Sequence, residues 1–448
     1  VQMGAKVVLL EGHKMGGDCL NYGCVPSKAL LSAAKQAKVM QTGEAFGVTP
    51  VKPKVDYAAA KDHVAKAIAT IEPHDSQERF ESLGVHVIRA YGSFISENEV
   101  QAGDTVIKAR RIVIATGSSP FVPPIPGIED VEYFTNENIF DLREKPDHLL
   151  IIGGGPIGME MAQAHIRLGS KVTVIEGMKA LGKDDPEAAA LVLEKMRAEG
   201  VEIVEDALAE KISQRGKVIT VETSNGTFKG SHLLMAVGRK VNLDKLDLDK
   251  GGVAFDRAIK VNDGLKSVSN RHVYAIGDAA GGLQFTHVAG YHASVIIRSM
   301  LFGLPSKART DHIPWVTYTD PELAQIGPTE AEAIKAHGKG SITTVRFEYS
   351  GNDRAIAQGK TDGFVKVMVM AGKPIGATIV GDQAGELIGV WALAIANKMK
   401  MSAVAAMVAP YPTLGEVNKR VAGAYFGPKL FENPTVKKVV GYVQRYLP

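Results

Sequence analysis

Cysteine is scarce in this chain of 448 residues, and the two that it has, Cys19 and Cys24, lie five positions apart. Structural disulfides are rare in reducing compartments, where paired cysteines are more often catalytic or metal-binding. Structural zinc takes about four ligands, and no further cysteine is there to supply them. The scarcity therefore disfavours a metal site and leaves two interpretations, a redox-active pair or two buried structural thiols.

Long apolar runs and an excess of charge of one sign are also missing. No stretch approaches the roughly 20 apolar residues that a membrane-spanning helix needs. The net charge of +3 comes from basic residues that are dispersed along the chain. We therefore expect no membrane partner, no nucleic-acid partner and a cytoplasmic location. The length predicts two to four domains.

The two cysteines lie in the glycine-rich segment GGDCLNYGCVPSKAL, residues 16–30. On a regular helix their side chains would diverge by about 140°, whereas a disulfide needs Cα atoms about 4.4–6.8 Å apart. The glycines allow a distorted turn, and a regular helix is predicted from Ser27 onward. Because a helix N-terminus stabilises a thiolate, Cys24 is the expected low-pKa partner, with Lys28 as a nearby positive charge.

A dinucleotide-binding fingerprint occupies the middle of the chain. A predicted strand at residues 149–152 leads into Gly153, Gly155 and Gly158, and a predicted helix continues to Leu168. In this pattern the first glycine allows a tight turn, the second lets the backbone approach a pyrophosphate, and the third lets helix pack on strand. The helix N-terminus then holds the anion. The segment predicts a nicotinamide dinucleotide site.

The residue that would contact the adenosine ribose is acidic. A second predicted strand, residues 171–175, ends in Glu176. A carboxylate there accepts hydrogen bonds from ribose hydroxyls and repels a 2′-phosphate. Lys179 is the nearest cation, and no arginine follows closely. We therefore predict that NADH is preferred over NADPH.

Three more segments combine a predicted strand with a turn or a terminal acid. MGAKVVLLEG, residues 3–12, contains Glu11 at the end of its strand; RRIVIATGSSP, residues 110–120, contains Thr116 and Gly117; VYAIGDAAG, residues 273–281, contains Asp278. Singly, each is an ordinary buried strand and turn.

Together, and in this order around the cysteine pair and the fingerprint, these segments resemble the flavoprotein pyridine nucleotide–disulfide oxidoreductase family, which includes dihydrolipoyl dehydrogenase, glutathione reductase and mercuric reductase. The resemblance covers essentially the whole chain. It implies an α/β fold with two Rossmann-like nucleotide-binding domains and an α+β C-terminal dimerisation domain. It also implies an enzyme that passes electrons from NAD(P)H through FAD to a Cys19–Cys24 disulfide and on to a small-molecule or protein-bound disulfide, working as a homodimer with a shared active site.

The same resemblance implies the roles of the site residues. Cys24 would be the flavin-facing thiolate, and Cys19 the exposed nucleophile that engages the substrate. Lys28 would pair with Glu160 where hydride arrives; the alternative is an unrelated pair of helix residues. Asp278 would hold the ribityl part of FAD, and Thr286 would open a helix whose N-terminus faces the flavin. The full set implied to lie at the cofactors, besides the fingerprint glycines and Glu176, is Glu11, Gly17, Thr116, Gly117, Gly238, Asp278, Thr286 and His287.

The domain boundaries expected from the resemblance are residues 1–146 and 266–311 for FAD, 147–265 for NAD(H), and 312–448 for dimerisation. Family members begin with a strand and a further GxGxxG that cradles the FAD pyrophosphate, and this chain starts after that point. We expect the sequence to be incomplete at its start.

The C-terminal region is expected to mix strands and helices. PWVTYTDPELAQIGPTEAEA, from Pro314, predicts a turn at Asp320–Pro321 and then a helix. The segment from Lys366 predicts two strands joined at Ala371–Gly372 and then one long amphipathic helix.

One position departs from the family pattern. Disulfide reductases normally have His-Pro-Thr-x-x-Glu near the end, where the His is the acid/base and the Glu orients it; here Glu416 is present but the His is Tyr411. A phenol with a pKa near 10 is a poor base at neutral pH. Two alternative functions therefore stay open. One is reduction of a metal ion or quinone, as in mercuric reductase but without its C-terminal cysteine pair, and the other is a flavin and thiol redox sensor without turnover. For Tyr411 itself, the alternative is a neutral replacement packed at an interface.

Overall fold

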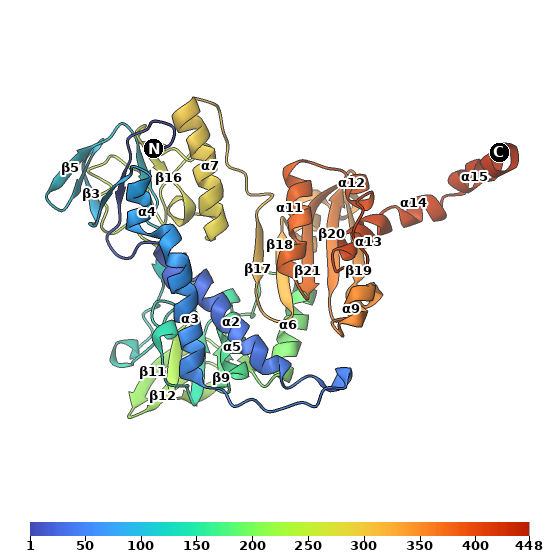
Figure 1. Ribbon diagram of the computed structural model, residues 1–448, viewed down its shortest axis with the longest axis horizontal. Coiled ribbons are helices and arrows are strands. Elements are labelled where there is room, and N and C mark those ends of the chain that lie inside the picture. The colour runs from blue at the N-terminus through green and yellow to red at the C-terminus, as the bar shows by residue number, and fades with distance from the viewer. Residues whose placement is uncertain (448) are drawn as a thin grey trace. The chain divides into compact units, whose positions relative to one another are not determined.

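The computed structural model describes residues 1–447, and its internal contacts divide the chain into two units (Figure 1). Unit 1 comprises Val1–Met178 and Gly200–Arg309. Unit 2 comprises Lys179–Glu199 and the chain from Thr310 onward. No helix within residues 1–447 is both long enough and apolar enough to span a membrane.

A parallel four-stranded sheet carries the glycine-rich fingerprint in unit 1. Its strand order is β10-β9-β8-β14, and helix α5 (Pro156–Arg167) follows β8. The side chains of residues 149–151 are fully buried, as expected for a parallel strand covered on both faces. The strands are β8 (His148–Ile152), β9 (Lys171–Ile175), β10 (Glu202–Val204) and β14 (His232–Met235). The predicted strand–helix–strand arrangement is therefore present.

Two short parallel pairs accompany this sheet. β1 (Val8–Leu10) pairs with β2 (His86–Ile88), and β6 (Ile112–Ile114) pairs with β16 (Val273–Ala275). The remaining named elements of unit 1 are α1 (Gly17–Asn21), α2 (Cys24–Val39), α3 (Tyr57–Ile71), α4 (Gln77–Ser82), β3 (Gly92–Ser96), β4 (Glu99–Ala102), β5 (Thr105–Lys108), β7 (Ser118–Pro120), β11 (Ala209–Arg215), β12 (Val218–Thr223), β13 (Gly226–Gly230), β15 (Arg239–Val241) and α7 (Thr286–Phe302). Helix α2 packs against both α3 and α5, which brings the cysteine segment beside the fingerprint helix.

Unit 2 is built on an antiparallel five-stranded sheet with the order β17-β18-β21-β20-β19. Its core centres on Trp391, whose indole donates a hydrogen bond to Asn418 Oδ1 at 2.8 Å. The elements are β17 (Pro314–Thr317), β18 (Glu322–Ile326), β19 (Ile342–Glu348), β20 (Phe364–Met370), β21 (Lys373–Gly381), α6 (Pro186–Ala198), α8 (Glu330–His337), α9 (Asp353–Ala357), α10 (Ala384–Leu387), α11 (Gly389–Ala396), α12 (Met401–Ala405), α13 (Glu416–Ala424), α14 (Gly427–Phe431) and α15 (Pro434–Tyr446).

The secondary structure of unit 2 differs from the prediction in two places. Strand β18 lies between the Asp320–Pro321 turn and helix α8, because its buried, non-alternating side chains sit in the interior of the sheet, where strand periodicity is lost. The long helix expected after β21 is divided into α10 and α11. The glycines Gly385 and Gly389 within that segment lower helix stability.

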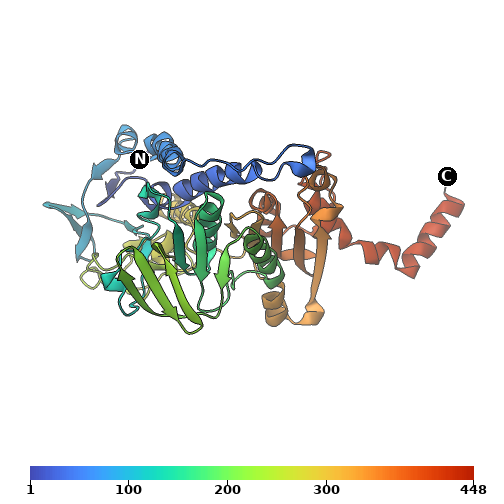
Figure 2. The same cartoon turned by 90° about the horizontal axis from the view of Figure 1, so that it is seen from below.

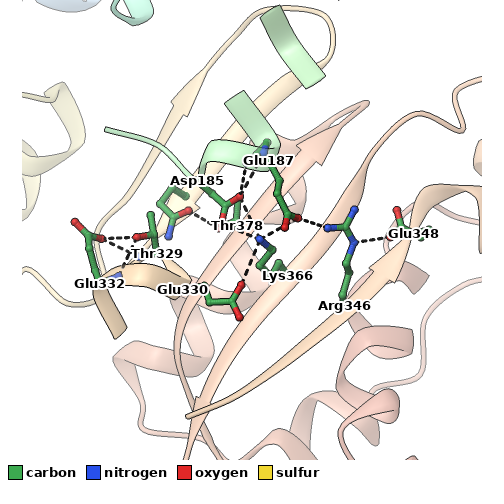
Figure 3. A network of polar contacts seen from close by, with 11 residues as sticks. Asp185, Glu187, Thr329, Glu330, Glu332, Arg346, Glu348, Lys366 and Thr378 are labelled. Atoms are coloured by element: carbon green, nitrogen blue, oxygen red, sulfur yellow. Dashed lines mark hydrogen bonds and ion pairs between the residues drawn. The ribbon is translucent and has the colours of Figure 1, made fainter. Parts of the chain in front are cut away.

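Helix α6 belongs to unit 2, although in sequence it lies between β9 and β10 of the unit 1 sheet. Asp185 accepts hydrogen bonds from the first turn of α6 and forms a buried ion pair with Lys366 of β20, with 3.0 Å between Oδ2 and Nζ (Figure 3). Trp315 Nε1 donates to Asp184 Oδ1 at 3.0 Å. Buried polar contacts therefore hold residues 179–199, which lie within the predicted 147–265 domain, to the C-terminal sheet of unit 2.

Candidate active site

The two cysteines occupy separate helices with a sharp break between them. Cys19 lies within the short helix α1, and Cys24 is the first residue of α2, three residues before the predicted start. The break falls at Gly23, where a Cβ would lie 3.1 Å from the Asp18 carbonyl oxygen and 3.2 Å from Cys19 Cα. Glycine thus lets the two helices meet closely enough for the thiols to interact.

The thiols differ in their affinity for a proton. A hydrogen bond from Cys19, with smaller contributions from Thr286 and the Lys28 charge, lowers the pKa of Cys24 to about 6 against the opposing effect of burial. The same hydrogen bond and burial raise the pKa of Cys19. Cys24 Sγ lies 3.5 Å from Thr286 Oγ1 at the start of α7. The pair therefore holds one proton, on Cys19, at neutral pH.

The two thiols differ in exposure. Cys24 is exposed and Cys19 is half-buried. The reason is that Cys24 begins α2 on the side of Thr286, while Cys19 lies inside α1, next to the buried Leu20.

The predicted pairing of Lys28 with Glu160 is present. Lys28 Nζ lies 2.8 Å from Glu160 Oε2, and the side chains are 37% and 6% exposed, respectively. The packing of α2 on α5 brings these residues together. Lys28 therefore lies one helical turn after Cys24 on α2, and its nearly buried carboxylate partner Glu160 lies on α5, the helix that follows the fingerprint glycines.

A second polar cluster lies deeper between α3 and α5, and it was not predicted from the sequence. The Tyr57 hydroxyl lies 3.1 Å from His165 Nε2, and Lys61 Nζ donates to the Ile139 carbonyl at 2.9 Å. Burial lowers the pKa of Lys61 to about 7 and that of His165 to about 3. The available signal was that Lys61 shares the inward stripe of α3 with Tyr57 and Val64, at helical spacing.

The fingerprint glycines meet the steric demands of a dinucleotide loop. A Cβ on Gly153, where φ is 111°, would lie 2.4 Å from the Ala236 carbonyl oxygen, and one on Gly158 would lie 2.0 Å from that of Gly153. A Cβ on Gly155 would have no described atom within 4 Å. Gly153 and Gly158 are thus needed for packing, and Gly155 leaves open the space that a pyrophosphate takes at the N-terminus of α5. These residues fit a nicotinamide dinucleotide.

Glu176 lies against this loop in the position expected of a ribose-binding acid. Its Oε2 accepts a hydrogen bond from the Gly154 backbone N–H at 2.7 Å, and its Oε1 accepts one from Met178 N–H at 2.9 Å. Two backbone N–H groups therefore hold the Glu176 carboxylate beside the glycine-rich loop.

The residues expected at FAD gather around a network that the sequence did not reveal. Ser118 Oγ donates to Asp278 Oδ2 at 2.5 Å, and Arg239 Nε donates to Ser118 Oγ at 2.7 Å. Arg239 also forms an ion pair with Asp18 of α1 at 3.1 Å. This chain of contacts links the segment of the redox-active candidate Cys19 to Asp278.

Most of the remaining residues expected at FAD lie where the backbone is accessible to a ligand. Gly17, Gly117 and Gly238 have positive φ, and a Cβ on any of them would have no described atom within 4 Å. Within the described residues, helix α7 has no side-chain cap at its first turn, and Thr286 and His287 are exposed there. Open glycines and an uncapped helix N-terminus fit a flavin dinucleotide.

Two further residues of this set hold backbone turns. Thr116 Oγ1 donates to the Asn242 carbonyl at 2.7 Å, and Glu11 accepts from the His13 N–H at 2.7 Å. Glu11 follows strand β1 directly, which is the place of a ribose-binding acid in a Rossmann unit.

Tyr411 lies in unit 2 and has an unexpected partner. Its hydroxyl donates to Asp353 Oδ2 at 2.9 Å, and this hydrogen bond raises the pKa of Tyr411. Asn352 Nδ2 donates to the Thr413 carbonyl at 3.1 Å, so the start of α9 holds the 411–413 segment at two points. Glu416 begins α13. The thiols and the Lys28–Glu160 pair belong to unit 1, and Tyr411 and Glu416 to unit 2.

Comparison with known proteins gives consistent matches over the chain. The family described as "Pyridine nucleotide-disulphide oxidoreductase" matches residues 1–293, and its dimerisation domain matches residues 313–422. Mercuric reductase of Lysinibacillus sphaericus is 32% identical over 94% of this chain and 78% of that protein. Dihydrolipoyl dehydrogenase of Bacillus subtilis is 32% identical over 93% of this chain and 92% of that protein.

Solved structures give the same match. LpdA from Mycobacterium tuberculosis superposes with a TM-score of 0.86 at 26% identity, over 94% of both chains. The Cu(II) complex of the HOCl-induced flavoprotein disulfide reductase RclA from Escherichia coli superposes with a TM-score of 0.84 at 26% identity, also over 94% of both chains. The predicted α/β fold with a C-terminal dimerisation domain is confirmed.

Proposed function

Because the chain belongs to the pyridine nucleotide-disulphide oxidoreductase family, we propose that it is an NADH-dependent disulfide reductase in which Cys19 and Cys24 carry the electrons to the substrate. Asp278, Thr286 and the open glycines would hold FAD, which would supply the hydride-transfer chemistry that links the nicotinamide to the Cys19–Cys24 disulfide. The observation that carries this proposal is the Cys24 thiol, with its lowered pKa, at the start of α2 and 3.5 Å from the start of α7.

In the second half of the reaction the thiol pair is reoxidised. The Cys19 sulfur attacks one sulfur of the substrate disulfide, the substrate S–S bond breaks, and the first substrate thiolate leaves. The Cys24 thiolate then attacks the Cys19 sulfur, which re-forms the Cys19–Cys24 disulfide and releases the second substrate thiolate. Two electrons pass to the substrate, which takes up two protons in total.

Cys19 must lose its proton as it attacks, and Tyr411 is a poor base for this step. The hydrogen bond from Cys19 to the Cys24 thiolate keeps the proton on Cys19. We therefore propose that the departing substrate thiolate receives this proton as the substrate S–S bond breaks, which leaves Cys24 as the thiolate that resolves the mixed disulfide. Tyr411 and Glu416, from the other subunit of a homodimer, would border the substrate.

Lys28 and Glu160 are proposed to lie where the nicotinamide delivers its hydride. Their 2.8 Å ion pair fixes a positive charge beside Cys24 and a nearly buried carboxylate on α5. Glu176 is proposed to select NADH, because a carboxylate held at the fingerprint by two backbone N–H groups would repel a 2′-phosphate. A lower Michaelis constant for NADPH than for NADH would contradict that choice.

Reduction of a metal ion is the second candidate function, and the pairing of Tyr411 with Asp353 favours it. This pair offers a phenol and a carboxylate, both exposed, where a general base is expected. The relatives named mercuric reductase and the Cu(II) complex of RclA support the same candidate.

The assembly of the protein belongs to the same proposal. The match to the dimerisation domain supports a homodimer in which unit 2 of one subunit completes the active site of its partner. The cytoplasmic location, quinone reduction and a redox sensor that reduces once without turnover stay predictions from the sequence.

Anaerobic titration of the flavin-loaded enzyme with NADH tests the proposal. Thiols are alkylated after each addition and counted by mass spectrometry of the peptide that contains both cysteines. We expect this peptide to change from unmodified to doubly alkylated as NADH is added, and a Cys24→Ser control to show flavin reduction without that change. A pair that is already fully alkylated before NADH, and unchanged after it, would overturn the proposal.

The substrate class is tested by continuous assays. Steady NADH consumption with lipoamide supports disulfide reduction, and consumption with Hg(II) or Cu(II) alone supports the second candidate. Consumption that stops after one equivalent with every acceptor supports a sensor.

A further inference from the structure

The C-terminal helix α15 (Pro434–Tyr446) stands clear of the sheet of unit 2. Figures 1 and 2 both show α14 and α15 leading away from strands β19 to β21. Helix α15 packs mainly against α14, its neighbour along the chain, and none of its residues, all of which the structure describes, is buried. Its surface is therefore available to a partner.

One face of α15 is apolar. Val436, Val439, Val440 and Val443 follow one another at spacings of three and four residues, and Tyr446 continues the same stripe. Val439, Val440 and Val443 are 56%, 46% and 45% exposed. So many valine side chains on one face of a helix, exposed to water, indicate a surface that binds a partner.

The opposite face of α15 is cationic. Lys437, Lys438 and Arg445 lie away from the valine stripe, and the segment from Pro434 to Leu447 has no aspartate or glutamate. Tyr442 and Tyr446 stack with 6.2 Å between ring centroids at the edge of the apolar stripe. The helix thus combines an apolar stripe, tyrosines at its border and positive charge on the other side.

Helix α15 has a good N-terminal cap but few stabilising tertiary contacts. Asn433 Oδ1 accepts hydrogen bonds from Thr435 N–H at 2.9 Å and Val436 N–H at 3.4 Å, and Pro434 occupies the first turn. Isolated helices shorter than about 12–15 residues are marginal in water, and α15 has 13 residues, with many β-branched side chains. A partner that covers the valine stripe would supply the missing stability.

We propose that α15 lies flat on an anionic lipid surface. The valines and Tyr446 would enter the boundary between headgroups and acyl chains, and Lys437, Lys438 and Arg445 would reach the lipid phosphates. Charge decides between this partner and a second copy of α15. Pairing two copies would bring together two helices whose charged side chains are all positive, whereas an anionic surface complements them. This proposal differs from the expectation from the sequence that the protein has no membrane partner.

Vesicle flotation of the full-length, flavin-loaded protein tests this proposal. We expect it to float with vesicles of equal parts phosphatidylglycerol and phosphatidylcholine at low salt, and to remain unbound with phosphatidylcholine alone or at high salt. A Lys437→Gln, Lys438→Gln variant should bind about fivefold more weakly for each cation removed. A Val439→Gln, Val443→Gln variant should lose roughly tenfold for each valine.

A matched control removes two exposed lysines from elsewhere in unit 2, Lys335→Gln and Lys339→Gln, and should bind the vesicles as the wild type does. NADH oxidation by every variant shows that the enzyme is folded, so a loss of vesicle binding is separate from any failure of the proposed function. Equal binding to both kinds of vesicle, or no binding at low salt, would overturn the proposal. So would a valine variant that changes the oligomeric state but not vesicle binding, since a second copy would then be the partner.

Discussion

The Tyr411 hydroxyl donates its single hydrogen bond to Asp353 Oδ2 at 2.9 Å and so cannot donate it to Glu416. In the family pattern, a glutamate at the Glu416 position orients the side chain that stands at position 411. Here a carboxylate 58 residues earlier in the chain accepts the hydrogen bond of the phenol, and Asn352 fixes the same segment through Thr413. The replacement of histidine by tyrosine therefore comes with a change of partner.

The first prediction concerns the acidity of Tyr411. Because the hydrogen bond to Asp353 raises the pKa of Tyr411, Asp353→Asn should lower that pKa toward the ordinary value near 10. NMR of ring-labelled tyrosine measures it, with Tyr411→Phe to assign the signal. The control is Asp362→Asn, an exposed aspartate of the same unit, which should leave the Tyr411 titration in place. An unchanged Tyr411 titration in Asp353→Asn would show that the Tyr411 hydroxyl and the Asp353 carboxylate are not hydrogen-bonded in solution.

A second prediction tests what the enzyme loses with histidine. Tyr411→His supplies an imidazole with a reference pKa near 6.5, which can take a proton from a thiol at neutral pH. Turnover of dihydrolipoamide should therefore rise and follow the titration of one group near that pKa. Tyr411→Phe, which has neither a base nor a hydroxyl, serves as the control and should show no rise. If neither variant gains activity, Tyr411 is not what limits disulfide chemistry.

The third prediction is a pH profile for Cys24. Only a thiolate reacts with iodoacetamide, so alkylation of the reduced enzyme at Cys24 should accelerate as the pH rises through about 6. Cys19→Ala removes the largest cause of the lowered pKa, so the midpoint should move up toward about 8.5. Cys19→Ser keeps a hydroxyl donor and should fall between the two. Identical midpoints in all three proteins would show that Cys19 does not tune Cys24.

The fourth prediction uses the ion pair beside the thiols. The Lys28 charge lowers the pKa of Cys24, and the Glu160 charge raises it. Lys28→Met should therefore shift the Cys24 alkylation midpoint upward, and Glu160→Gln should shift it downward. Opposite signs are the test, because general loosening of the fold would move both variants in the same direction.

The fifth prediction concerns the stability of unit 2. Lys366 and Asp185 form an ion pair whose side chains are 4% and 2% exposed. Removing one partner leaves a buried charge, so Lys366→Met should lower the free energy of unfolding by about 3–5 kcal/mol. Lys195→Met breaks an exposed pair with Asp362 and should cost less than about 1 kcal/mol. Denaturant unfolding measures both, and equal losses would contradict the importance of burial.

Features set by short, local patterns could be predicted from the sequence. The strands at residues 149–152 and 171–175 and the helix between them are present, because the glycines that define them act on their immediate neighbours: Gly158 needs close approach to the backbone of Gly153, five positions earlier. The Lys28–Glu160 contact spans 132 residues and came from the resemblance, not from spacing.

Features set by long-range burial could not be predicted in this way. Asp353 gives no local sign that it meets Tyr411, and Arg239 gives none that it joins Asp18 to Ser118. Strand β18 was missed because a fully buried strand loses its alternation. The assignment of α6 to unit 2 depends on Lys366, a charged residue in a strand that otherwise looks apolar, and only the fold shows that Asp185 neutralises it.

The path of the chain through α6 limits how this protein can be divided. The dimerisation domain matches residues 313–422 as one continuous stretch, yet the compact unit that contains it also needs residues 179–199. A fragment that starts at Thr310 would carry Lys366 into its interior without Asp185, and would leave Trp315 without Asp184. A swap between relatives would therefore have to transfer both stretches together. Recombination at a single point between Glu199 and Thr310 would separate a buried lysine from the most deeply buried of its carboxylate partners.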